Sequence, residues 1–88
     1  RCLSRGLGDV YKRQLLAITA EECGELTQEC MKIIRFGQDN DNLTEEAGDV
    51  MCMIQLLIEK DLVNQAELNK RIVEKREKLK TFSTLTNL

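Results

Sequence analysis

Two pairs of acidic residues have the spacing and the chemistry of a metal site. Glu22 and Glu25 stand three residues apart, and so do Glu46 and Asp49. Residues three apart lie on the same face of an α-helix, so each pair presents two carboxylates side by side. If the two helices pack antiparallel, four carboxylates converge, and hard oxygen ligands of this kind suit Mg²⁺ or Mn²⁺. The spacing therefore predicts a divalent-metal site, with Mg²⁺ as the expected ion and Mn²⁺ as the alternative.

A solvated surface is the simpler explanation of either pair taken alone. Charged residues make up 32% of the chain, and a single pair of glutamates on a helix most often faces water. Here both pairs adjoin apolar residues, with Cys23 and Leu26 around the first and Val50 and Met51 around the second. Carboxylates that flank an apolar seam are better suited to ligand binding than to a freely solvated face.

The composition predicts an all-α protein. The 88 residues include no Pro, Trp or His, two Phe and one Tyr, and they are rich in Glu, Lys, Leu and Gln. A core without large aromatic side chains buries little area per helix. We therefore expect an antiparallel helical array that forms a bundle and is completed by homo-oligomerisation, as a homodimer or a dimer of dimers. The absence of His leaves carboxylates and metal as the means of catalysis.

The four cysteines, Cys2, Cys23, Cys30 and Cys52, form no C-x-x-C motif. Without His to complete a zinc site, they are expected to be buried, reduced thiols. No signal peptide and no long apolar run are present, which indicates the reducing cytoplasm and no membrane partner.

Charge is distributed unevenly along the chain. Between residues 15 and 49 nine acidic residues face only Lys32 and Arg35, whereas between residues 60 and 80 seven basic residues face four acidic ones. An acidic centre argues against a nucleic-acid partner, which requires a continuous basic stripe. A cation together with a compact phosphorylated ligand fits this pattern better.

Apolar residues recur at intervals of three and four from Leu15 onward, which is the period of an amphipathic helix. The first helix is expected to end at Phe36, with Gly37 as the C′ residue. Its expected apolar stripe is Leu16, Ala20, Cys23, Leu26 or Thr27, Cys30, Ile33 and Ile34.

Two further helices are predicted after a short polar link. Asn42 is the expected N-cap of the second helix, with Glu45 in capping-box spacing. Asn64 and Glu67 have the same relationship at the start of the third, which is expected to run to about Lys80.

The two ends of the chain differ from its centre. Residues 1–14 lack an initiator Met, contain Gly6 and Gly8, have no apolar period and resemble translated adapter sequence. We expect them to be foreign or disordered, the alternative being that Val10 to Gln14 extend the first helix. Residues 15–83 are expected to form the domain, and residues 84–88 a polar tail.

At these motifs the chain resembles a family. The run EECGEL at residues 21–26, followed by EEAGDV at residues 45–50, is similar to the paired acidic signature of MazG-like nucleotide pyrophosphohydrolases, members of the all-α NTP pyrophosphatase superfamily. The run KIIRFG at residues 32–37 resembles the stretch that follows the first motif in short phage and bacterial members. Agreement continues to residues 76–80, so the resemblance covers about residues 15–83.

The resemblance implies that Glu22, Glu25, Glu46 and Asp49 are Mg²⁺ ligands. It also implies hydrolysis of a nucleoside triphosphate between the α- and β-phosphates, which gives a monophosphate and pyrophosphate. Metal neutralises the phosphate charge and activates the attacking water, and a carboxylate next to the ligands accepts the proton.

The catalytic base expected from the resemblance is Glu21 or Glu29. Lys32 and Arg35 are expected to bind phosphate, with help from Lys75 or Lys78 of the third helix or of a neighbouring subunit. For Glu29 and Lys32 an equally plausible interpretation is a surface ion pair that contributes little to stability. Met51, Met53 and Phe36 are candidates for a base pocket or for simple core residues. The set expected to bind substrate is Lys32, Arg35, Lys75 and Lys78.

Two alternatives stay open. A phosphoribosyl-ATP pyrophosphohydrolase would use acidic residues in the same way. However, the run Val50-Met51-Cys52-Met53 differs from the run containing Tyr and His that is associated with those enzymes. A catalytically silent helical dimerisation module is the second alternative, and it treats the four carboxylates as coincidence or relics.

Overall fold

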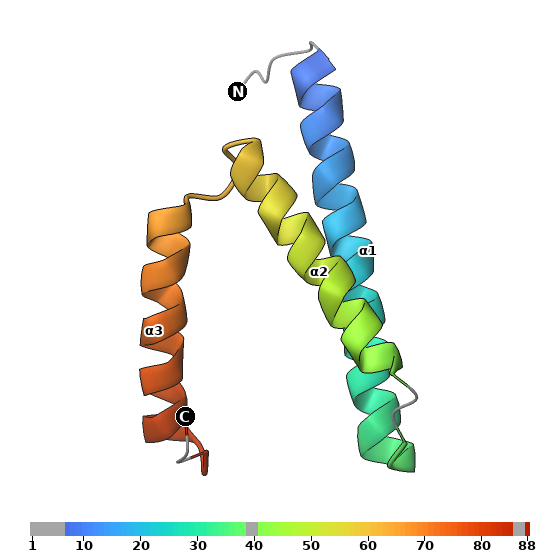
Figure 1. The fold of residues 1–88 in the computed structure, drawn as a ribbon, viewed down its shortest axis with the longest axis vertical. Coiled ribbons are helices and arrows are strands. Elements are labelled where there is room, and N and C mark those ends of the chain that lie inside the picture. The colour runs from blue at the N-terminus through green and yellow to red at the C-terminus, as the bar shows by residue number, and fades with distance from the viewer. Residues whose placement is uncertain (1–6, 39–40, 86–87) are drawn as a thin grey trace.

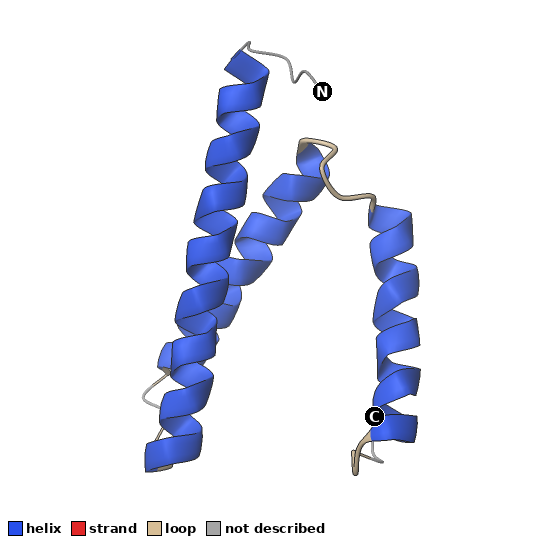
Figure 2. Ribbon diagram, turned by 180° about the vertical axis from the view of Figure 1, so that it is seen from behind, coloured by secondary structure: helices blue, strands red, loops and turns tan. Residues whose placement is uncertain are grey.

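The computed structural model describes residues 7–38, 41–85 and 88, and within them all regular structure is helical. The order is α1 (Leu7–Phe36), α2 (Asn42–Glu59) and α3 (Gln65–Phe82). The prediction of an all-α fold is confirmed. As Figures 1 and 2 show, α1 and α2 lie side by side and run in opposite directions, while α3 stands away from both.

The first helix is longer at its N-terminal end than the predicted one. It begins at Leu7 and passes without a break through the expected domain boundary between residues 14 and 15. Residues 11–14 contain neither Gly nor Pro, so nothing in them opposes propagation of the helix. Tyr11 also contacts Lys60, the residue that follows α2, whose Nζ atom lies 5.1 Å from the centre of the tyrosine ring. Such an exposed cation–π contact contributes about 0.5–1 kcal/mol. Residues 1–6 lie outside the described part of the chain.

The helix ends test three predicted caps. Gly37 is confirmed as the C′ residue of α1, since its φ is 73° and its N–H donates to the Ile33 carbonyl at 2.7 Å. Asn64 is confirmed as the N-cap of α3, where its Oδ1 accepts a hydrogen bond of 2.9 Å from the Glu67 backbone N–H. For α2 the prediction of Asn42 was wrong. Asp41 takes the N-cap position in a left-handed conformation, with φ 70°, which a short polar side chain tolerates.

The core lies between α1 and α2. Leu15, Met53 and Leu57 are buried, and the partly buried Leu56 and Val63 pack against them. The residues of α1 that are turned toward α2 recur at intervals of four and three, as expected for a helix seam. They are Leu15, Thr19, Glu22, Leu26, Glu29 and Ile33, all of them buried or half-buried.

A second stripe on α1, displaced by one residue, is left uncovered. It consists of Leu16, Ala20, Cys23, Thr27, Cys30 and Ile34, and all six are exposed. We call this stripe the uncovered face of α1. The predicted apolar stripe therefore mixed two faces, because only Leu26 and Ile33 of its members are turned toward α2. The expectation of buried thiols was wrong for this chain by itself, since Cys23, Cys30 and Cys52 are exposed. Cys2 lies outside the described residues.

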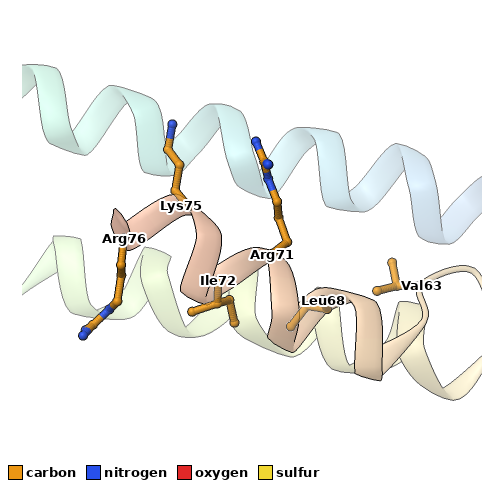
Figure 3. A pocket seen from close by; sticks show the side chains of 6 residues that line it. All are labelled: Val63, Leu68, Arg71, Ile72, Lys75 and Arg76. Carbon is orange, nitrogen blue, oxygen red and sulfur yellow. The ribbon is translucent and has the colours of Figure 1, made fainter. Parts of the chain in front are cut away.

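The third helix has no extensive contact with the other two. Its apolar residues Leu68 and Ile72 line an open hollow with Val63 and three basic side chains. Figure 3 shows Arg71 and Lys75 extending from one side of α3 and Arg76 from the other. Within the described residues no helix is both long enough and apolar enough to cross a bilayer.

Candidate metal centre

Three of the four predicted ligands meet where α1 crosses α2. Glu22, Glu25 and Glu46 each offer an oxygen atom, and these atoms lie within 4.8 Å of one another. Two helical residues three apart supply the first pair, and the antiparallel return of the chain brings Glu46 of α2 beside them. Glu22 and Glu46 are half-buried at the seam, whereas Glu25 is exposed. We call this group, together with Asp49, the carboxylate cluster.

Asp49 lies next to these three residues without belonging to the tightest group. It is exposed, one helical turn after Glu46. Its charge nevertheless raises the pKa of both Glu22 and Glu46, which places it within electrostatic reach of each. The two acidic pairs predicted from the sequence thus come together in one cluster.

The electrostatics of the cluster favour a bound cation. Burial, followed by repulsion from Glu25 and Asp49, raises the pKa of Glu22 to about 7. The same causes raise the pKa of Glu46, with burial again the largest and the charge of Glu25 the next. A cation among the carboxylates would offset this repulsion and favour their ionised forms.

The hydrogen bonding of Glu22 also favours a bound cation. Its Oε2 atom is buried and has no hydrogen-bond partner, although buried polar atoms are nearly always paired. Among the described residues no basic side chain forms an ion pair with Glu22, Glu25, Glu46 or Asp49. A set of carboxylate oxygens with one unpaired buried member fits Mg²⁺ or Mn²⁺, both of which prefer hard oxygen ligands.

Glu29 and Lys32 form the predicted ion pair. The Nζ atom of Lys32 lies 3.2 Å from Oε2 of Glu29, whose side chain is only 13% exposed. Glu29 lies one helical turn after Glu25, and its charge contributes to the raised pKa of Glu46. The structure thus contains the ion pair between Glu29 and Lys32, and this pair lies at the edge of the cluster.

The remaining candidate site residues are exposed. Glu21, one helical turn before Glu25, and Arg35 lie on α1. Lys75 and Lys78 are exposed on α3, which does not pack against the acidic pair of helices. The expected role of Lys75 and Lys78 would need a different placement of α3 or a second subunit.

A small polar hollow lies beside the cluster at the end of the α1–α2 pair. Its volume is about 170 Å³, and it is lined by Glu29, Lys32, Phe36, Gln38 and Asn42. Of the three residues considered for a base pocket, Phe36 lines this hollow, Met53 is buried in the core and Met51 is exposed elsewhere on α2. Gln38 was not singled out from the sequence, and Asn42 was singled out only as a helix cap. Their positions near the two ends of the predicted interhelical link were the one sign that they lie close in space.

The chain also matches a known protein family. A family model described as the MazG nucleotide pyrophosphohydrolase domain matches residues 11–81, which include all of the carboxylate cluster and most of α3. The match begins within the segment that was expected to be foreign. Neither the curated proteins nor the solved structures gave a match.

Proposed function

The chain belongs to the MazG nucleotide pyrophosphohydrolase family, and on this basis we propose that it hydrolyses nucleoside triphosphates between the α- and β-phosphates with Mg²⁺ as cofactor. Water supplies the oxygen that bonds to the α-phosphorus, and pyrophosphate leaves with the bridging oxygen. The observation that carries the proposal is the convergence of Glu22, Glu25 and Glu46, with oxygens within 4.8 Å of one another.

The carboxylate cluster would hold the metal through Glu22, Glu25, Glu46 and Asp49. When bound, Mg²⁺ supplies neutralisation of phosphate charge and activation of water. The half-buried seam restricts water around Glu22 and Glu46, which strengthens electrostatic interactions there. The four side chains therefore act by binding and orientation.

We assign the role of general base to Glu29 in preference to Glu21. Glu29 is largely shielded from solvent and its charge acts on Glu46, whereas Glu21, one helical turn before Glu25, is exposed. The hydrogen bond from Lys32 to Oε2 fixes the orientation of the Glu29 carboxylate. A base held in place can accept the proton of the attacking water without first ordering its own side chain.

The test of this function is an assay of pyrophosphate release. The chain is expected to release pyrophosphate and a nucleoside monophosphate in equal amounts from at least one common ribo- or deoxyribonucleoside triphosphate when Mg²⁺ is present. Chromatography of the products checks the position of cleavage. Release of inorganic phosphate with a nucleoside diphosphate would place the cut at the wrong bond, and no turnover of any nucleotide would contradict the proposal.

We also propose that the working form is a homodimer or a dimer of dimers. The uncovered face of α1 repeats at intervals of four and three, which is the pattern of a helix-packing seam. Its small members, Ala20, Cys23 and Thr27, permit close approach of another helix. Cys23 and Glu25 are two residues apart and therefore about 200° apart around the helix. A second copy packed on the uncovered face would thus leave Glu25 accessible.

Light scattering tests the assembly. At micromolar concentration the chain is expected to have a mass of at least twice 10.1 kDa. Ala20→Lys places a charge on the uncovered face and is expected to shift the mass toward that of a monomer, because a buried unpaired charge is strongly unfavourable. Gln28→Lys, at an exposed position away from this face, is the matched control. A well-folded monomer of the unsubstituted chain would contradict the assembly.

A further inference from the structure

The polar hollow and the carboxylate cluster share one face of α1. Glu25, Glu29, Lys32 and Phe36 follow one another at intervals of four, three and four residues, so they form a continuous line along the helix. Phe36 lies eleven residues beyond Glu25, or roughly 16 Å along the helix axis. On α2, Asn42 precedes Glu46 by one helical turn. The hollow is therefore the next space along from the cluster on both helices.

The size of the hollow limits what it can hold. Pockets that take a whole drug-sized ligand have volumes of about 300–1,000 Å³, whereas this one measures about 170 Å³. It suits one planar part of a nucleotide better than an entire nucleotide. With the phosphates at the cluster, the part that reaches the hollow is the nucleoside end.

The charge of the hollow favours a nucleobase over a phosphate. Lys32 is the basic residue of the lining, and Glu29 already pairs with it at 3.2 Å. The two charges cancel, so the hollow has no net attraction for a phosphate group. Gln38 and Asn42 each carry an amide with donors and an acceptor, which can bind the edge of a heterocycle.

Phe36 supplies a surface for stacking. Its side chain is 68% exposed although it lines the hollow, so its ring is available for contact. Aromatic side chains of this kind provide stacking platforms for bases of any identity. The ring would bind the face of a base while the two amides bind its edge.

We propose that the polar hollow is the nucleobase subsite of this enzyme, in which Phe36 stacks on the base and Gln38 and Asn42 select it through hydrogen bonds. The proposal rests on the proposed function, because it assumes a nucleotide whose phosphates lie at the carboxylate cluster. Stacking determines affinity for all bases, and the amides determine preference among them.

The first test is the replacement of Phe36. Phe36→Ala is expected to raise KM for every nucleotide substrate by roughly 10- to 100-fold, in line with the loss of one base-stacking contact. Its kcat is expected to stay within about threefold, because a contact equal in the ground and transition states affects binding alone. Phe36→Trp is expected to restore KM, whereas Phe36→Leu, which is apolar without a stacking ring, is not. Phe82→Ala removes another exposed phenylalanine, on α3, and serves as the matched control.

Binding without turnover separates this proposal from the proposed function. The dissociation constant of an α,β-methylene nucleoside triphosphate, measured by calorimetry with Mg²⁺, should rise in Phe36→Ala by the same factor as KM. Binding of inorganic tripolyphosphate, which has no base, should not change. If the unsubstituted chain binds the analogue but cleaves no nucleotide, the proposed function fails while the Phe36→Ala comparison still decides the subsite.

Three results would overturn the subsite. They are unchanged binding of the analogue by Phe36→Ala, an equal loss of tripolyphosphate binding, and full restoration by Phe36→Leu. The amides have their own readout, since Asn42→Ala and Gln38→Ala should alter the ratio of kcat/KM between bases. An unchanged ratio in both variants would remove their selective role. Thermal melting of each variant confirms that it is folded.

Discussion

Glu22→Gln and Asp49→Asn are each expected to lower turnover by about 10³-fold or more. Each amide keeps the shape of the side chain but removes one negative charge from the group that would hold Mg²⁺. Loss of a single electrostatic stabiliser at a reacting centre costs 10²- to 10³-fold in typical enzymes. A metal ligand also positions the substrate phosphates. The loss of turnover in these variants should therefore be at or above the upper end of that range. Steady-state pyrophosphate release measures the effect.

The stability of the metal-free protein provides the control for folding. Burial and neighbouring carboxylates raise the pKa of Glu22 to about 7 from 4.5, so the folded state holds this proton more tightly than the unfolded state does. The contribution of Glu22 to the free energy of unfolding is therefore fully present below about pH 4.5 and is lost as the pH rises through about 7. Glu22→Gln should remove this part of the pH dependence and melt no lower than the unsubstituted chain at pH 8.

Glu59→Gln is the matched variant for both measurements. Glu59 is exposed at the C-terminal end of α2 and lies outside the carboxylate cluster. Its replacement should change stability by less than about 0.5 kcal/mol and leave turnover unchanged. Near-normal turnover in both Glu22→Gln and Asp49→Asn would mean that the four carboxylates do not form a metal site.

Removal of divalent metal is expected to abolish activity. The candidate ligands are all carboxylates, and the described cysteines do not join their group, so excess chelator should stop turnover and Mg²⁺ or Mn²⁺ should restore it. Zinc should not be required. Mg²⁺ at 100 times its dissociation constant should also stabilise the folded protein by about 2.7 kcal/mol.

The two glutamate variants test whether the stabilisation by Mg²⁺ arises at the carboxylate cluster. It should be much smaller in Glu22→Gln, because that variant has lost a ligand, and unchanged in Glu59→Gln. Thermal melting with and without Mg²⁺ measures it independently of catalysis. Full turnover in chelator would contradict metal dependence altogether.

Local sequence was sufficient to predict the helices and the two acidic pairs. Helix formation depends on periods of three and four residues and on the absence of Pro, both of which can be read without a fold. The caps at Gly37 and Asn64 follow from backbone chemistry within a few residues. The spacing of Glu22 with Glu25, and of Glu46 with Asp49, is likewise a property of one helix each. Their meeting required only that the chain turn back after Gly37.

Only the tertiary structure decided which face of α1 packs against α2. Leu15 and Leu16 begin two stripes that differ by one residue, which is about 100° around the helix. The stripe from Leu16 is the more apolar, and hydrophobic pattern alone therefore favoured it. The structure instead turns the stripe containing Glu22 and Glu29 toward α2. Local pattern fails here because the carboxylates occupy the seam, as residues of a functional site often do at the expense of core packing.

The position of α3 was also beyond local reasoning. The apolar and basic residues of α3 can be read from the sequence. The sequence pattern does not show which surface of the protein they contact. The structure holds α3 away from α1 and α2, so Lys75 and Lys78 do not reach the carboxylate cluster within the chain. Packing between helices depends on the whole arrangement of side chains in space, and a periodic pattern records only which residues share a face. The sequence by itself thus determined the helices and the acidic pairs, while the seam, the hollow and the separation of α3 depended on tertiary structure.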